Sequence, residues 1–242
     1  MKLLRTLAGG IGFLTIAPLS FPVEALSVLA FPLAGGIVAA LIVGVRVLAH
    51  PAGPLVVGAL AVAADVVATR GLHYDALCDT ADGLGGFMDT ERRLGVMDDP
   101  HVGAFGVLAL VVIVVVRVAV FAAPQVSATG LVLALAWSRS LMGVVLLESP
   151  RARPGGMTRW FQAPGEALRV ASVLLLAGLS LDVVLVEGLP GLLGVALGTI
   201  AGGLLWLRAH RELGGVTGDV VGAVGLLAET ALIVGVVVGG AL

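Results

Sequence analysis

The sequence predicts an all-α, polytopic integral membrane protein, built as one helical bundle with about seven transmembrane helices. Hydrophobic residues make up 59% of the chain and charged residues 12%, whereas soluble domains have about 45–50% and about 25%. The mean hydropathy is +1.11. The connections between apolar runs are too short for a soluble domain, so we expect residues 1–242 to form a single integral membrane domain.

Seven apolar runs approach the length of about 20 residues that a helix needs to cross the hydrocarbon core. Before them, Lys2 and Arg5 precede a short apolar stretch that resembles a secretion signal. Because Pro18 follows the small residue where cleavage would occur, we expect an uncleaved interfacial helix instead. The predicted crossings, with the edges of the fifth and sixth least defined, are residues 26–49, 54–70, 103–123, 128–147, 167–187, 189–208 and 219–241.

The basic residues predict the orientation, because Lys and Arg collect on the cytoplasmic side of a membrane protein. With the N-terminus inside, the turns at 124–128 and 182–189 lie outside and contain no Lys or Arg. An odd number of crossings places the C-terminus outside. Eleven of the 14 basic residues then lie at or near the cytoplasmic face: Lys2, Arg5, Arg70, Arg92, Arg93, Arg151, Arg153, Arg159, Arg169, Arg208 and Arg211.

The densest group of acids lies between the second and third apolar runs, on the predicted cytoplasmic side. In a helix, Asp75, Asp79 and Asp82 fall at i, i+4 and i+7, so the three carboxylates share one face. Their mutual repulsion calls for a counter-charge. Mg²⁺ supplies one through hard oxygen ligands, while a solvated surface helix would explain the same acids without any chemistry.

A second polar patch follows in the same loop, after the flexible stretch Gly83-Leu-Gly-Gly86. It contains Arg92, Arg93, Asp98 and Asp99. Two acidic groups suggest two magnesium ions, which together can clamp a diphosphate during an in-line phosphoryl transfer. Arginines can neutralise the remaining phosphate charge.

Other polar residues lie in or beside apolar runs, where an isolated charge is costly. Asp65 calls for a partner, and Arg117 or Arg139 could supply it. Glu229 needs a partner or a water-filled cavity. The segment Gly214–Asp219 could approach a phosphate at the start of the last helix, or its glycines could serve close helix packing.

These motifs resemble the cobalamin synthase (adenosylcobinamide-GDP ribazoletransferase) family, an integral membrane family, over nearly the whole chain. The family pattern Gly-x-His-x-Asp-Gly-Leu-x-Asp-x-x-Asp-Gly matches at Gly71, His73, Asp75, Leu77, Asp79, Asp82 and Gly83. Similar features are Arg92-Arg93-Leu94, Ser138-Arg139 and Gly214-Gly215-x-Thr217-Gly218-Asp219. The chain departs from the pattern at Ala76, where glycine is usual, at Asp98-Asp99-Pro100 in place of Arg-Asp-Ser, and at Leu226, often acidic.

The resemblance implies the last stage of cobalamin biosynthesis, with an acidic active site at the cytoplasmic side of the inner membrane. The 3′-hydroxyl of α-ribazole, or of its 5′-phosphate, attacks adenosylcobinamide-GDP and displaces GMP. Asp99 is the preferred proton acceptor and His73 the reserve. We expect Mg²⁺ at Asp75, Asp79, Asp82 and Asp98, and substrate contacts from Arg92, Arg93, Arg139, Thr217, Gly218 and Asp219.

Two alternatives remain open at this point. Asp79-Thr-Ala-Asp82-Gly83 also opens the pattern of CDP-alcohol phosphotransferases, although later positions of that pattern do not match. A cation-coupled transporter could use Asp65, Arg117 and Glu229 along a pathway. We expect a lipid bilayer and no nucleic acid as partners. The sequence leaves open the acceptor's phosphorylation and base, the corrinoid pocket and the oligomeric state, and a homo-oligomer is allowed.

Overall fold

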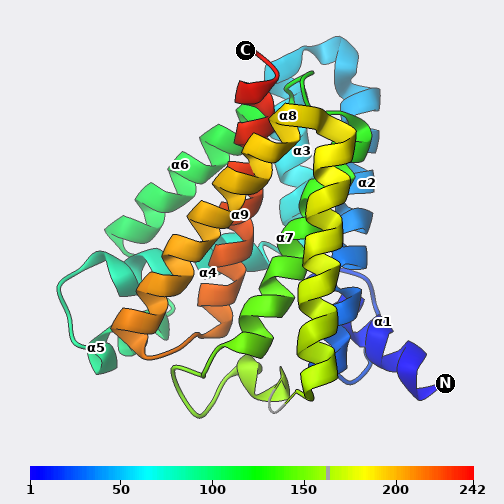
Figure 1. Cartoon of the computed structure of the whole chain (residues 1–242). Coiled ribbons are helices and arrows are strands. Elements are labelled where there is room, and N and C mark those ends of the chain that lie inside the picture. The colour runs from blue at the N-terminus through cyan, green and yellow to red at the C-terminus, as the bar shows by residue number, and fades with distance from the viewer. Residues whose placement is uncertain (162–163) are drawn as a thin grey trace.

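The computed structural model describes residues 1–161 and 164–242 and folds them into a bundle of α-helices (Figure 1). The all-α prediction is confirmed for these residues. The two termini lie at opposite ends of the bundle (Figure 1). The helices are α1 (Lys2–Leu14), α2 (Phe31–Ala49), α3 (Pro54–Thr69), α4 (Leu72–Gly85), α5 (Thr90–Met97), α6 (Ala104–Phe121), α7 (Ala128–Glu148), α8 (Glu166–Leu213) and α9 (Gly218–Gly239), with 3₁₀ turns at Ala25–Ala30, His50–Ala52 and Met157–Phe161.

Every predicted apolar run lies in a helix, and the fifth and sixth runs are the two arms of α8. A straight helix of 48 residues would be about 72 Å long, more than twice the hydrocarbon thickness of about 30 Å. At Gly188 the backbone leaves the helical region (φ 68°, ψ −141°), and Pro190 follows. The second arm therefore turns back toward the other end of the bundle and diverges from the first (Figure 1).

Five helical segments of the described chain are long and apolar enough to cross a membrane, with α8 counted once. The bent pair α3 and α4 forms a sixth candidate. A multi-pass membrane protein is therefore supported. The count of seven crossings and the cytoplasmic side of the N-terminus stay predictions.

The second arm of α8 packs closely against α9 because glycines recur every four residues on its contact face. A Cβ atom at Gly194 would lie 2.7 Å from the carbonyl oxygen of Leu232, and one at Gly198 would lie 2.8 Å from that of Ala228. Such small residues let helix backbones approach each other within a membrane. This contact fixes where α9 begins, and with it Asp219.

The turn between α3 and α4 orients the acidic helix. Arg70 (φ 56°) and Gly71 (φ 69°) both adopt the left-handed conformation, which glycine enters without steric cost. The chain bends by 90° there, so α4 leaves the direction of α3. Together with α5 and the start of α9, it forms one end of the bundle, the end that also carries the N-terminus (Figure 1).

Candidate functional site

The predicted acidic face exists on α4. All three aspartates lie within this one helix: Asp75 is exposed, while Asp79 and Asp82 are half-buried. The opposite face packs through Tyr74 and Leu77, which are buried. The amphipathic arrangement expected from the sequence therefore holds, with the acids on the less buried side of the helix.

Asp79 lies in the middle of a larger group that we call the acidic cluster: Asp75, Asp79, Asp82, Asp98 and Asp219. Partial burial, followed by the negative charges of Asp75, Asp219, Asp82 and Asp98, raises the pKa of the Asp79 carboxyl to about 6. Carboxylates from α4, the end of α5 and the start of α9 thus act on one another. The acids of α4, the polar patch around Asp98 and the segment Gly214–Asp219 therefore come together here.

The raised pKa of Asp79 predicts how stability depends on pH. The ordinary value is 3.8, so the folded protein holds this proton more tightly than the unfolded chain does. The stabilisation is complete below about pH 4 and is lost as the pH rises through about 6. Without divalent cations, we expect the melting temperature in detergent to fall between about pH 4 and about pH 6, and the Asp79→Asn variant to lose this part of the fall.

Asp82 connects α4 to the start of α6. Its carboxylate accepts hydrogen bonds from the backbone N–H groups of Gly103 (2.7 Å) and Gly106 (2.9 Å). Both neighbours must be glycines for this approach, because a Cβ atom at either position would lie within 2.5 Å of the carboxylate. A negative charge at a helix N-terminus is also favourable. Asp82 therefore holds the loop that carries Asp98 against α4.

Arg153 is the cation that reaches the acidic cluster. Its guanidinium pairs with Asp98, and its second nitrogen lies 4.0 Å from Asp219. Backbone bonds between the loop after α7 and the segment before α9 hold it there: Ala152 N–H to the carbonyl of Val216 (3.1 Å) and Val216 N–H to that of Pro150 (3.0 Å). From the sequence, Arg153 is placed only among the basic residues of the predicted cytoplasmic face.

Asp99, the proton acceptor predicted from the sequence, bonds within its own loop. Its carboxylate accepts a hydrogen bond from the backbone N–H of His101 (2.9 Å) and lies 2.6 Å from the ring Nδ1 of the same residue. The side chain is 55% exposed. Asp98, one residue earlier, is the acid that joins the cluster, because α5 ends there and the chain changes direction.

The arginines of α5 divide between two environments. Arg92 is exposed. Arg93 is buried, pairs with Glu212 (2.9 Å) and donates to the carbonyl of Gly83 (3.0 Å). Arg93 thus joins α5 to the ends of α4 and α8, whereas the side chain of Arg92 is open to solvent.

Within residues 1–161 and 164–242, no three His, Cys, Asp or Glu side chains converge closely enough to hold a metal ion by themselves. The donor set is nonetheless of the kind that Mg²⁺ prefers, since this ion keeps several waters and uses one or two carboxylates together with substrate phosphates. Burial and, after it, the repulsion within the cluster raise the pKa of Asp79, and a cation would relieve that repulsion.

Comparison with known proteins gives the family. The model described as Cobalamin-5-phosphate synthase matches residues 6–237. The adenosylcobinamide-GDP ribazoletransferase of Pseudomonas paraeruginosa is 35% identical over 213 residues, which cover 86% of this chain and 85% of the relative. That of Azorhizobium caulinodans is 37% identical (86% and 83% covered), and that of Desulforamulus reducens is 33% identical (91% of each). No solved structure matches the chain.

The chain belongs to the cobalamin-5-phosphate synthase family. The resemblance found from its motifs is thereby confirmed, and with it the expectation of an enzyme of this family. The motif residues Gly71 to Gly83 form the turn before α4 and α4 itself. The segment Gly214 to Asp219 forms the break between α8 and α9.

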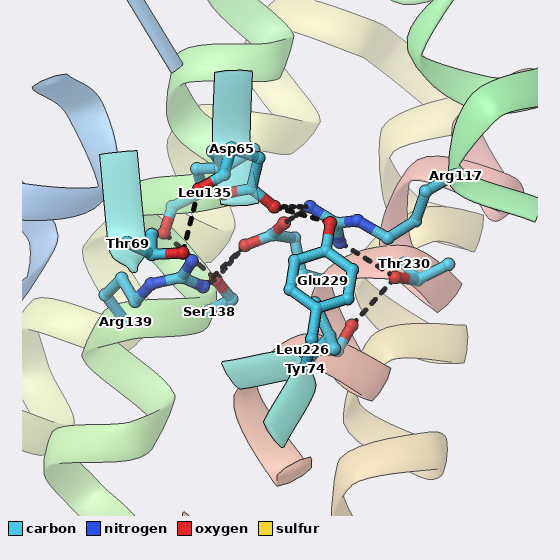
Figure 2. A network of polar contacts seen from close by, with 10 residues as sticks. All are labelled: Asp65, Thr69, Tyr74, Arg117, Leu135, Ser138, Arg139, Leu226, Glu229 and Thr230. Carbon is cyan, nitrogen blue, oxygen red and sulfur yellow. Dashed lines mark hydrogen bonds and ion pairs between the residues drawn. The ribbon is translucent and has the colours of Figure 1, made fainter. Parts of the chain in front are cut away.

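In this member of the cobalamin-5-phosphate synthase family, Arg139 lies in a buried ion network and not in the acidic cluster. Figure 2 shows Arg117 between Asp65 (2.7 Å) and Glu229 (2.7 Å), while Arg139 contacts the other oxygen of Glu229 (2.6 Å). All four side chains are at most 1% exposed. Two cations and two anions balance, so Arg139 is already neutralised inside the bundle.

Of the two partners predicted as possible for Asp65, the structure shows Arg117, and the network also gives Glu229 its partners. Tyr74 adds a hydrogen bond from its hydroxyl to Asp65 (2.8 Å), which ties α4 to α3 (Figure 2). Helices α3, α4, α6, α7 and α9 all contribute to it. The charges that suggested a transporter pathway thus neutralise one another.

The residues at and after Gly214–Asp219 cap the start of α9 and let it pack closely against α4. Thr217 is buried and caps α9 by accepting from the backbone N–H of Val220 (3.2 Å). A Cβ atom at Gly222 would lie 2.7 Å from the methyl of Ala76, so this glycine serves close contact between α9 and α4. Gly218 and Asp219 instead line a pocket that also contains His73, which is 1% exposed.

Proposed function

We propose that this protein is an adenosylcobinamide-GDP ribazoletransferase. It would transfer the phosphocobinamide moiety of adenosylcobinamide-GDP to the 3′-hydroxyl of α-ribazole, or of α-ribazole 5′-phosphate. GMP leaves, and adenosylcobalamin or its 5′-phosphate forms. The relatives bear this name, and the observation that carries the proposal is the convergence of five aspartates at one end of the bundle.

The diphosphate of the donor would lie over the acidic cluster together with Mg²⁺. Asp75, Asp79, Asp82 and Asp98 are the proposed ligands, with waters and phosphate oxygens completing two sites. When bound, the metal neutralises the diphosphate and stabilises the charge that develops on the phosphorus oxygens. Asp82 can bind the metal while it also caps α6, because each carboxylate oxygen has a second lone pair.

Arginines would complete the charge balance. Arg153 pairs with Asp98 and lies near Asp219, so it can exchange these carboxylates for a phosphate when the cation enters. Arg92 is exposed and can bind a phosphate oxygen from solvent. Arg93 and Arg139 would contribute indirectly, by holding α5 and α7 in place. Thr217, Gly218 and Asp219 form the proposed opposite wall.

The acceptor hydroxyl must lose its proton as the new P–O bond forms and the bond to the GMP oxygen breaks. We propose Asp98 for this step, through the carboxylate oxygen that would not hold the metal, with His73 as the alternative. The reaction would occur at the cytoplasmic face of the inner membrane, with the N-terminus on that side, which the grouping of basic segments with the acidic cluster supports.

Substitutions at neighbouring positions separate Asp98 from Asp99. We expect Asp98→Asn to lower the rate of GMP release at least about tenfold, because it removes a charge from the cluster. Asp99→Asn is expected to stay within about twofold of the parent, because its side chain points to solvent and His101. Steady-state rates in proteoliposomes measure both, and the reverse order would restore Asp99 as the proton acceptor.

The function itself is tested with purified protein in proteoliposomes and Mg²⁺. Adenosylcobinamide-GDP with α-ribazole should yield GMP and adenosylcobalamin in equal amounts, and EDTA should stop the reaction. CDP-diacylglycerol with a free alcohol should yield no CMP. Turnover of the lipid substrate alone would replace this proposal with a CDP-alcohol phosphotransferase.

A further inference from the structure

A narrow apolar cleft lies beside the acidic cluster. Three aromatic rings pack together along it, with centroid distances of 6.2 Å between Phe13 and Phe31, 5.9 Å between Phe31 and Phe161, and 6.1 Å between Phe13 and Phe161. Met142 and Leu146 of α7 add aliphatic wall. The cleft is a thin slit: the centre of a water molecule can occupy only about 30 Å³ of it, within a gap between protein atoms of about 440 Å³ that includes open solvent.

One buried polar group in this cleft is left without a protein partner. His73 lines the cleft, is 1% exposed, and its Nε2 has no hydrogen-bond partner among the residues that the structure describes. A buried nitrogen without a partner is costly, so a ligand that bonds to it gains the energy of relieving that cost. The motif histidine of α4 therefore points to a ligand with a matching polar atom.

The mouth of the cleft meets the acidic cluster. Gly218 and Asp219 line it, and Asp219 is also the residue near Arg153 and Asp79. A ligand whose apolar part fills the interior would thus hold its polar part against the carboxylates. These features call for a flat, mostly apolar aromatic group that carries one hydrogen-bonding nitrogen and a hydroxylated substituent.

We infer that the cleft binds the aromatic base of the acceptor nucleoside, with His73 as a positioning residue. A benzimidazole-type base has one ring nitrogen attached to ribose and one free acceptor nitrogen, to which an Nε2–H of His73 can donate. The ribose then lies at the mouth, with its hydroxyls toward Asp219 and the acidic cluster. This inference rests on the proposed function, since it names the site of that reaction's acceptor.

The competing occupants fit less well. Guanine carries several donors and acceptors on its edges, and an apolar cleft with one histidine would leave most of them unpaired. A corrin ring system is far too large for this thin slit. A lipid chain would satisfy the apolar wall and leave His73 Nε2 without a partner.

Filling the cleft tests the inference directly. We expect Leu146→Trp to raise the Kd of free 5,6-dimethylbenzimidazole at least about tenfold, with the Kd of GMP unchanged within about twofold, measured by equilibrium dialysis of the detergent-solubilised protein. Leu192→Trp is the matched control, since Leu192 is 53% exposed on α8 and lies outside the cleft. Equal binding of the base by parent and Leu146→Trp, no binding at all, or a selective loss of GMP binding would each overturn it.

A second variant protects the test against misfolding. Leu146→Ala shortens a side chain in the wall and so enlarges the cleft. Relative to the parent protein, it should bind the larger base naphthimidazole more tightly than benzimidazole.

The role of His73 has its own test. For His73→Gln we expect the KM for α-ribazole to rise about tenfold while kcat changes less than about threefold. A fall in kcat with an unchanged KM would make His73 the proton acceptor and remove its positioning role.

The outcomes also separate this inference from the proposed function. If the parent protein forms no adenosylcobalamin but its binding of the base depends on Leu146, the cleft stands and the transfer reaction fails. If the parent transfers normally while Leu146→Trp leaves the KM for α-ribazole unchanged, the function stands and the cleft assignment fails.

Discussion

Replacing Asp79 by asparagine is expected to lower the rate of GMP release about 100-fold or more. Asp79 is the carboxylate on which the other members of the acidic cluster act together, and it would contribute directly to cation binding beside the diphosphate. The amide keeps the size of the side chain but removes the charge that a hard cation needs. Steady-state rates at increasing Mg²⁺ measure the effect, and we expect the concentration for half-maximal rate to rise as well.

The same variant should fold at least as well as the parent. Removing a charge from a group of like charges relieves repulsion, so the melting temperature at neutral pH should stay equal or rise. Asp182→Asn is the matched control, because Asp182 is exposed on the first arm of α8. Full activity in Asp79→Asn, with the melting temperature retained, would refute metal ligation by this residue.

Replacing Glu229 by glutamine is expected to destabilise the bundle by about 3–5 kcal/mol, the cost of removing one partner from a buried ion pair. Arg117 and Arg139 would then share only Asp65 as counter-charge, in the interior of a membrane protein (Figure 2). The unfolding midpoint in detergent, followed by circular dichroism, measures the loss.

A charge-balanced double variant makes this prediction specific. Adding Arg139→Met to Glu229→Gln removes the unpaired cation, so the double variant should be more stable than Glu229→Gln alone. Glu148→Gln is the surface control, because its contact with Arg169 is 3.7 Å long and partly exposed and should be worth at most about 1 kcal/mol. Additive losses in the double variant would contradict a coupled network.

Features that depend on local spacing could be predicted from the sequence. The shared face of Asp75, Asp79 and Asp82 follows from helix periodicity. The need of Asp65 for an arginine partner follows from the cost of a lone charge among apolar helices, although the sequence did not choose between Arg117 and Arg139. The two arms of α8 were also predictable, because each approaches the length of a crossing.

Features that depend on long-range contacts could not be predicted in this way. Arg153 reaches the acidic cluster only because the loop after α7 bonds to Val216, which no local pattern encodes. The choice between Asp98 and Asp99 depends on the last turn of α5, where one residue changes the direction of the side chain. Arg139 matched a family feature, but its partner comes from α9, far along the chain.

The place of Glu229 in the last helix has a consequence for biogenesis. Chains enter the membrane from the N-terminal end during synthesis, so Asp65, Arg117 and Arg139 are inserted before α9 exists. Until residues 218–239 arrive, the nascent bundle holds two guanidinium groups and a single carboxylate of this group. The final insertion event therefore locks the earlier helices together, and a ribosome-bound intermediate lacking it would remain loosely assembled and open to surveillance by membrane proteases.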